Sequence, residues 1–258
     1  MKQETEHLRP YLADLHVHTV LSPCAEVEMI PPLIVRRARQ LALGIIAITD
    51  HNSAENVGAV MEAAEGLDLR VLPGMEVQTR EEVHLLCLFD GLEEVLDWQA
   101  AVYAHLPPEK NRADVFGPQF VVDATGEFIR YNDRLLVTST SLSVEDVARE
   151  VEERGGLCLG AHVDRPSFSL LANLGFVPEG VPFAAMEITP YANADDLVRQ
   201  HSSLAGYALV CSGDAHHPSE MSNKTILTLK EPTTAEILLA FRHQGGRRVK
   251  VVDDPHQT

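Results

Sequence analysis

Residues 11–19, YLADLHVHT, decide the fold, because an apolar strand there ends in two histidines. Residues i and i+2 of an extended strand point to the same face, so His16 and His18 can address one ion. Six further short apolar runs occur along the chain, at residues 45–49, 69–72, 83–89, 157–163, 184–188 and 207–212. Helical periodicity occupies most of the gaps, at residues 32–43, 54–66, 92–105, 144–154, 194–204 and 234–243. This alternation predicts an α/β fold whose parallel sheet, at about 250 residues, closes or nearly closes into a barrel.

One segment, residues 106–140, interrupts the alternation. Two short apolar pieces, at 120–122 and 128–129, flank the turn-forming sequence Asp123-Ala124-Thr125-Gly126. Apolar pieces on either side of an Asp/Gly-containing turn indicate a β-hairpin. We therefore expect one domain over residues 1–258, with a hairpin inserted at about 106–140 between the fourth and fifth strand–helix units.

The charge balance argues against a simple basic nucleic-acid binder. The 258 residues carry 21 Lys plus Arg against 38 Asp plus Glu, a formal charge of 21 − 38 = −17. Binding to a duplex depends mostly on the neutralisation of phosphates by cationic side chains. No apolar run is long enough to cross a bilayer, no leader is evident, and the four cysteines show no CxxC spacing. We expect a cytoplasmic protein with reduced thiols and no membrane contact.

The apolar runs end in titratable side chains. In a barrel of this kind, functional groups gather at the carboxyl ends of the strands. Most of the residues at the run ends are of types that bind metals. The run-end residues are Asp14, His16, His18, Asp50, His51, Glu76, His84, His162, Asp164, Arg165, Glu187, Asp214, His216 and His217. A lone histidine is more often a structural or surface residue, and this interpretation fits His7, His105, His201, His243 and His256. Recurrence at the same place on separate strands argues instead for one shared site.

The residue types at these ends favour divalent metals. Carboxylates and imidazoles buried together without a cation would lose their hydration with little compensation. A mixed set of imidazole and carboxylate ligands suits Zn, Mn or Fe better than Ca or Mg. The sequence therefore predicts two or three divalent ions at the barrel mouth.

These motifs, taken together, resemble a known family. The set is Asp14-Leu-His16-Val-His18-Thr19, Thr49-Asp50-His51-Asn52, Gly74-Met75-Glu76, His84, Ala161-His162 and Gly213-Asp214-Ala215-His216. It is similar to the four motifs of the polymerase and histidinol phosphatase (PHP) superfamily, over residues 11 to about 230. The resemblance implies a distorted TIM-like (β/α)7 barrel with a trinuclear metal centre in its mouth. It also implies the hydrolysis of phosphate esters.

The resemblance assigns ligands residue by residue. His16, His18, Glu76 and Asp214 would hold a first metal, and Glu76, His84 and His162 a second, with Glu76 bridging the pair. A third metal would be held by His51, His216 and Cys24. Many relatives have a histidine at the position of Cys24, and a thiolate there is a competent soft ligand. An unliganded loop thiol is the alternative for Cys24.

Residues beside the ligands have less certain roles. Asp14 and Asp50 could accept the spare imidazole N–H of a ligand histidine, or could simply cap strand ends. Arg165 is the best candidate to grip a phosphate, and an ion pair with Asp164 or another acid is the alternative. His217 is a candidate general acid or a spectator. Glu187 is a candidate outer ligand or an ion-pair partner facing the core.

The expected reaction is phosphoester hydrolysis by a metal-bridging hydroxide that attacks phosphorus in line. A phosphomonoesterase acting on a small metabolite or nucleotide ranks above an exonuclease or oligonucleotide phosphodiesterase, because of the acidic charge. Two other classes remain: a metal-binding module without catalysis, and a carbon–nitrogen hydrolase of the amidohydrolase type. The last lacks a lysine at any predicted strand end. The sequence leaves the natural substrate and the oligomeric state open.

Overall fold

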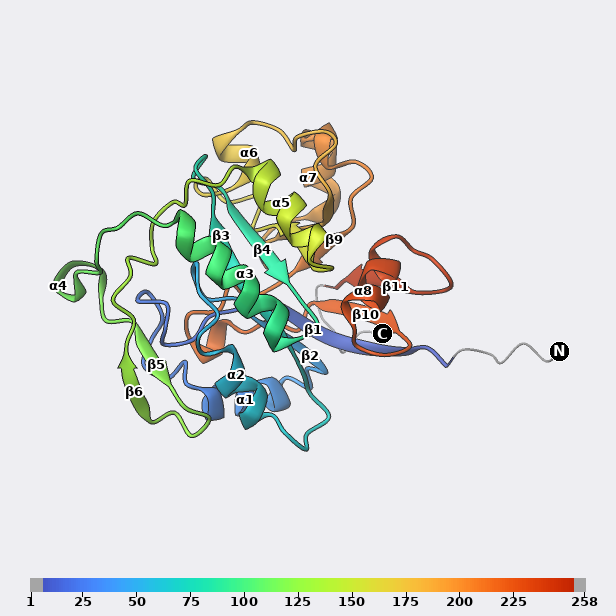
Figure 1. Ribbon diagram of the computed structural model, residues 1–258. Coiled ribbons are helices and arrows are strands. Elements are labelled where there is room, and N and C mark those ends of the chain that lie inside the picture. Colours follow the sequence, from blue (N-terminus) through green and yellow to red (C-terminus); the bar gives the residue numbers. More distant parts are fainter. Residues whose placement is uncertain (1–6, 253–258) are drawn as a thin grey trace.

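A computed structural model of the chain describes residues 7–252. Its main feature is a sheet of nine strands within that range, in the order β11-β10-β1-β2-β3-β4-β7-β8-β9. The strands are β1 (Arg9–Val17), β2 (Ile45–Ile48), β3 (Arg70–Gln78), β4 (His84–Leu88), β7 (Leu157–Gly160), β8 (Phe183–Ile188), β9 (Leu209–Cys211), β10 (Thr225–Leu229) and β11 (Arg248–Val251). The two edge strands, β9 and β11, lie against each other, so the sheet nearly closes. The expected α/β barrel is confirmed (Figure 1).

Helices cover the outside of this barrel. They are α1 (Pro31–Gln40), α2 (Val57–Ala63), α3 (Leu92–His105), α5 (Val144–Glu153), α6 (Leu170–Asn173) and α7 (Ala194–Gln200). Local sequence explains where several begin: Pro31 and Pro32 occupy the first turn of α1, and Ser143 and Asp146 form a capping box at the start of α5. One further helix, α8 (Thr234–Phe241), instead covers one end of the barrel, and its Ile237, Ala240 and Phe241 belong to the inner apolar cluster.

The alternating pattern of the strands produces two apolar layers. Inward-facing side chains such as Leu15, Ala47 and Leu159 form the inner cluster together with α8. Outward-facing side chains such as Ile46, Val71 and Cys158 pack beneath the helices. This arrangement fills the barrel, so only its ends can hold a site.

The expectation of an all-parallel sheet is wrong at β4. This strand pairs antiparallel with both of its neighbours, β3 and β7. Only residues 79–83 separate β3 from β4, whereas a parallel crossover needs a dozen or more residues. The chain therefore turns back in a hairpin, and His84 starts β4 at the edge where β3 ends, opposite Gln78. Strands β10 and β11, which pair antiparallel beside β1, were also not predicted.

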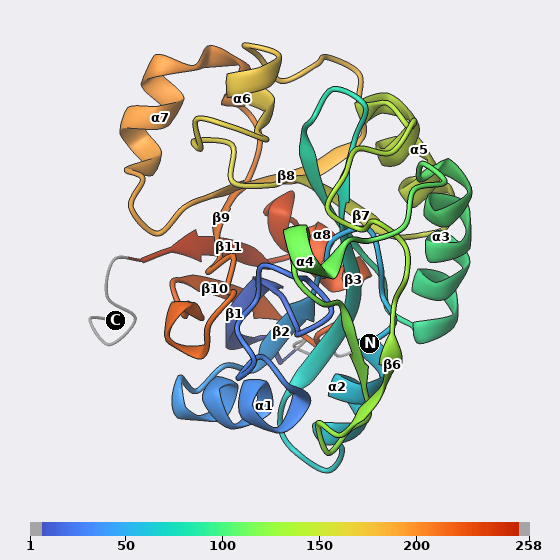
Figure 2. The ribbon, with the colours of Figure 1, turned by 90° about the vertical axis from the view of Figure 1, so that its left-hand side faces the viewer.

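The segment 106–140 holds the expected hairpin, formed by β5 (Phe120–Val122) and β6 (Phe128–Tyr131), and a short helix α4 (Ala113–Phe116). It is fixed to the loops that follow β1 and β2. The amide N–H of Phe120 donates to the Val20 carbonyl at 3.0 Å, and Asn52 Nδ2 donates to the carbonyls of Leu136 and Thr138 at 2.7 and 2.8 Å. The hairpin thus borders the barrel mouth, at the end opposite α8 (Figures 1 and 2).

Candidate metal centre

The structure brings the motif residues to the same end of the barrel. His16 and His18 lie at and just beyond the end of β1, and His51 follows β2. The remaining candidates are Glu76 on β3, His84 at the start of β4, His162 after β7, and Asp214 and His216 after β9. The reversal of β4 matters here, because a parallel β4 would carry His84 to the opposite end of the barrel.

Glu76 lies at the centre of the cluster, with 1% of its surface exposed. Its Oε1 is 2.8 Å from His84 Nδ1, 3.1 Å from His162 Nε2 and 3.4 Å from His16 Nε2. Its Oε2 is 2.8 Å from His51 Nδ1 and 3.5 Å from His18 Nε2. Burial alone would raise the pKa of Glu76, but the surrounding imidazoles hold that pKa well below its usual value. Glu76 is therefore an ionised carboxylate that faces five histidines from four segments of the chain.

Asp214 provides a second carboxylate on the side of the cluster where β1 ends. Its Oδ1 lies 3.2 Å from His16 Nε2 and 3.2 Å from His18 Nε2. Burial would raise the pKa of Asp214, but the nearby imidazoles lower it well below its usual value. The other oxygen, Oδ2, is ion-paired with the Arg165 guanidinium. The ion pair that the sequence offered as the alternative role of Arg165 is therefore with Asp214 and not with Asp164. Asp164 instead accepts hydrogen bonds from Thr189.

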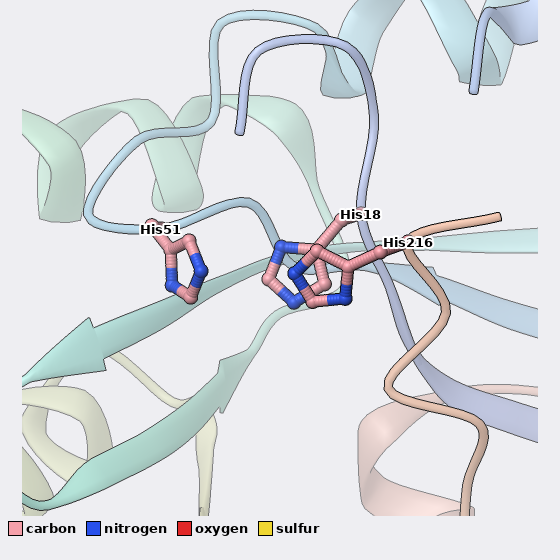
Figure 3. A group of neighbouring side chains, drawn as sticks. All are labelled: His18, His51 and His216. Atoms are coloured by element: carbon pink, nitrogen blue, oxygen red, sulfur yellow. The ribbon is translucent and has the colours of Figure 1, made fainter. Parts of the chain in front are cut away.

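A third group consists of His18, His51 and His216 (Figure 3). The ring centroids of His18 and His216 are 4.1 Å apart, and those of His18 and His51 are 4.6 Å apart. Cys24 is exposed in the loop after β1 and lies beside the rings of His51 and His216. Partial burial would raise the pKa of the Cys24 thiol, but hydrogen bonds from His216 and His51 lower it to about 6. A thiol of this acidity is readily available as a thiolate ligand.

Two of the histidines have buried partners that set their tautomers. Glu187 Oε2 lies 2.9 Å from His16 Nδ1, and it also accepts the backbone N–H of His162 at 2.9 Å. Ser22 Oγ donates to Asp50 at 2.7 Å and lies 2.9 Å from His18 Nδ1. Both partners accept the Nδ1 proton, which leaves the Nε2 lone pairs of His16 and His18 free to bind a cation.

The sequence left two roles open for Asp14 and Asp50, and the contacts of Asp14 match the capping role. Asp14 accepts backbone N–H groups from Gly213 and Ser222 at 3.0 and 2.7 Å, so it ties β1 to the loop after β9 and contacts no imidazole. Burial raises the pKa of Asp14 to about 7. Asp50 reaches His18 only through Ser22. Glu187 carries out the orienting role that the sequence offered to Asp14, because the tertiary fold, not sequence adjacency, decides which carboxylate faces the ring.

The donor set fits divalent cations. The described part of the chain holds three groups of candidate ligands, and within each group the ligand atoms lie within 4.8 Å of one another. The groups are His16, His18 and Asp214; His51, Glu76 and His84; and His18, His51 and His216. Oε2 of Glu76 and Nδ1 of His162 are buried without a hydrogen-bond partner, although burial normally requires one. A cation within the second group would satisfy Glu76 Oε2, and cations in the other groups would offset the crowding of the imidazoles.

Other candidates lie at the rim or away from the centre. His217 Nδ1 accepts from the backbone N–H of Ser219 and so caps the short turn Pro218–Glu220. His105 contacts Ser141 and belongs to α3, and His256 lies outside the described residues. Ser22 and Phe168, whose ring stacks on His84, had no signal in the motif spacing. Their contacts arise from loops whose course the sequence does not reveal.

Part of the sequence is similar to two curated exoribonucleases. A stretch of 80 residues is 35% identical to the 5'-3' exoribonuclease Rnm of Salmonella typhimurium and covers 29% of this chain and 26% of that protein. The homologous exoribonuclease of Escherichia coli is 34% identical over the same length. In these alignments the chain spans about a quarter of the length of its curated relatives.

Solved structures show the same fold. The lesion-specific endonuclease PfuEndoQ from Pyrococcus furiosus superposes with a TM-score of 0.73 at 18% identity, covering 93% of this chain and 58% of that one. An amidohydrolase from Chromobacterium violaceum superposes with a TM-score of 0.55 at 18% identity, covering 82% of this chain and 90% of that one.

The sequence family is decided by a broader match. The PHP domain model matches residues 14–166, which is more than half of the chain and includes every motif from Asp14 to His162. The family and the three groups of ligand atoms together indicate a metal-dependent hydrolase of phosphoester bonds. The chain belongs to the PHP domain family.

Proposed function

We propose that the chain hydrolyses phosphoester bonds at the ends of nucleic acids. The observation that carries the proposal is the cluster around Glu76, where ionised carboxylates and tautomer-fixed imidazoles converge at an open barrel mouth. The similarity to an exoribonuclease over 80 residues, and the fold shared with an endonuclease solved with a 27-mer duplex, support nucleic acid as the substrate class.

The same side chains would form three cation-binding groups. His16, His18, Glu76 and Asp214 would hold one ion, and Glu76, His84 and His162 a second, so Glu76 would contribute to both. His51, His216 and Cys24 would hold a third. When bound, divalent cations supply an activated water and offset the charge that builds on the phosphoryl oxygens.

Arg165 would bind the substrate beside these groups. It lines a groove of about 610 Å³ together with Cys24, His162 and Asp214. Its side chain is 44% exposed, and its guanidinium is ion-paired with Asp214. A guanidinium offers a planar pair of donors, so Arg165 can turn toward a phosphate and orient it at the mouth.

His217 would supply a proton to the leaving oxygen. Its Nδ1 accepts from the Ser219 amide, which keeps the proton of the neutral ring on Nε2. Asp50 acts only indirectly, through the hydrogen bond of Ser22 that orients His18. His217 is thus a candidate catalytic residue, and Asp50 is a positioning residue.

A second function is favoured by the size of the groove and the charge of the chain. A volume of about 610 Å³ lies in the range of small-molecule sites, and a formal charge of −17 disfavours long polyanions. Both features suit a phosphomonoesterase that acts on a mononucleotide or another small phosphorylated metabolite.

The two functions are separated by one experiment. Protein stripped by a chelator and reloaded with Mn or Zn is given an end-labelled single-stranded oligonucleotide, mononucleotides and sugar phosphates. Stepwise shortening of the oligonucleotide supports the first function, and release of phosphate from small monoesters alone supports the second. Inertness toward all of these substrates would contradict both functions.

A further inference from the structure

Phe168 is an exposed aromatic residue at the edge of the metal centre. Its ring stacks on the ring of His84, with centroids 4.9 Å apart and planes inclined by 21°, while 40% of its surface stays exposed. A large apolar ring that has one face on a candidate ligand and a free part in solvent requires an explanation. Neither the family motifs nor the proposed reaction uses it.

Phe168 has a backbone conformation that is unfavourable for a bulky residue. Its φ is +57°, a left-handed conformation that bulky side chains rarely adopt. The carbonyl of Phe168 accepts the backbone N–H of His84 at 2.9 Å, so the residue is tied to the start of β4. Such conformations persist where the surroundings over-determine them, and they occur often at ligand-binding sites.

The loop that presents Phe168 also presents Arg165. The buried Ser169 donates from Oγ to the Arg165 carbonyl at 2.8 Å, and the Arg165 amide donates to the His162 carbonyl at 2.9 Å. These bonds make residues 162–169 one hydrogen-bonded loop, which begins with a candidate metal ligand. A guanidinium and an aromatic ring are therefore held three residues apart on one loop.

We propose that Phe168 is a specificity-determining residue whose exposed ring stacks on the nucleobase next to the scissile phosphoester. This inference rests on the proposed phosphoesterase function and narrows its substrate class to nucleotides that present an unpaired base. A phosphate has no affinity for an apolar ring, whereas every base has a π-face that stacks on an aromatic side chain. Arg165 would take the phosphate and Phe168 the base, so an end whose base is free to stack is preferred.

The test compares two single-stranded oligonucleotides that differ only in the bases of their terminal nucleotides. One carries natural bases at both ends, and the other has abasic residues there. For the Mn-loaded protein we expect Phe168→Ala to lower the ratio of kcat/KM for the natural over the abasic substrate by roughly ten-fold, the scale of base–aromatic stacking. Phe168→Tyr should restore the ratio. Phe168→Leu, which still covers His84 but has no π-face, should not restore it.

A matched control is Phe176→Ala, which removes another exposed phenylalanine, located after α6. It should leave the ratio at the wild-type value. If Phe168 only shields His84, its alanine variant will slow both substrates equally, and the ratio will not change. That result would overturn the inference.

A second readout does not depend on turnover. An oligonucleotide with 2-aminopurine at its end should lose fluorescence on binding to wild-type protein, because the stacked base is quenched, and keep it with Phe168→Ala. Quenching without cleavage of any substrate would refute the proposed function and leave the stacking site standing. Cleavage of both oligonucleotides at equal rates, without quenching, would refute the stacking site alone.

Discussion

Glu76 shows at the scale of one residue why the site requires cations. A buried carboxylate usually has a raised pKa, yet five imidazoles within 3.5 Å keep this one ionised. Its Oε2 nevertheless makes no hydrogen bond of good geometry, although His51 Nδ1 is 2.8 Å away. A charged oxygen that is buried and unsatisfied is costly unless an ion or a donor reaches it.

Replacing this carboxylate by its neutral isostere should therefore release metal. We expect Glu76→Gln to lower the bound Mn or Zn, measured by elemental analysis after dialysis, and to reduce phosphoester hydrolysis by at least about 100-fold. Glu62→Gln, which changes an exposed glutamate on α2, is the matched control and should change neither value. Full metal content in Glu76→Gln would show that this residue is not a ligand.

Glu187 provides a second test, of a residue that acts through a histidine. Because it accepts the Nδ1 proton of His16, its removal frees that ring to adopt the wrong tautomer. We expect Glu187→Ala to weaken metal binding about 10- to 100-fold, and Glu187→Gln to weaken it less, because the amide oxygen still accepts a hydrogen bond. Isothermal titration with Zn measures both, and the exposed Glu179→Gln is the control. Equal affinity in Glu187→Ala and wild type would refute the orienting role.

Sequence reasoning predicts the grouping at this scale but not the roles. The His16–His18 spacing follows from strand geometry, and the residues with ligand chemistry all reach the mouth. The partner of His16 could not be predicted, since Glu187 lies 171 residues further along the chain.

At the scale of elements, the reversal of β4 decides whether the site can exist. The five residues 79–83 leave room for a turn and for no helix, so the gap length alone contains the signal for an antiparallel strand. The positions of the expected helices agree closely with the structure, because their periodicity and caps are local properties. The alternation of strands and helices did not predict β10 and β11, because these two strands flank α8 and pair antiparallel with each other.

The helix that covers the barrel end, α8, is held by a buried ion pair. Arg247 donates to both carboxylate oxygens of Glu236 on α8, at 2.9 and 2.8 Å. We expect Glu236→Gln to lower the free energy of unfolding by about 2 kcal/mol at pH 7, measured by urea denaturation, with the exposed Glu231→Gln as the control.

The pH dependence of this loss follows from the depressed pKa of Glu236. Hydrogen bonding from Arg247 lowers that pKa below its ordinary value of 4.5. The stabilisation is therefore present above pH 4.5 and is lost as the pH falls through the folded-state pKa. The gap between wild type and Glu236→Gln should narrow below pH 4.5, and a gap that stays constant down to pH 3 would exclude the ion pair as its cause.

At the scale of the whole molecule, the charge of −17 has two separate meanings. Part of it lies in the mouth, where cations would offset Glu76 and Asp214, and most of the rest lies on solvated faces. Bulk charge therefore says little about the potential at the site. No helix among the described residues is long and apolar enough to cross a membrane.

Removal of metal should be visible as a loss of global stability. Cations that bind only the folded chain stabilise it by about 2.7 kcal/mol at a concentration 100 times Kd. We expect chelation to lower the Tm by several degrees, and added Mn or Zn to restore it, in a calorimetric scan. Glu76→Gln should show a smaller shift between the two conditions. Identical melting curves with and without chelator would contradict the presence of a metal centre.

The pairing of β1 with β10 also limits the order in which the chain can fold. Arg9 lies opposite Leu229, so the first strand pairs with a strand that is more than 200 residues away in the chain. Contacts of such separation are slow to form, because loop closure must precede the gain from pairing. During synthesis β1 can pair early only with β2. The barrel can close only after the C-terminal strands have left the ribosome. Until then the edge of β1 that pairs with β10 stays exposed, and this is the stage at which a chaperone would be needed most.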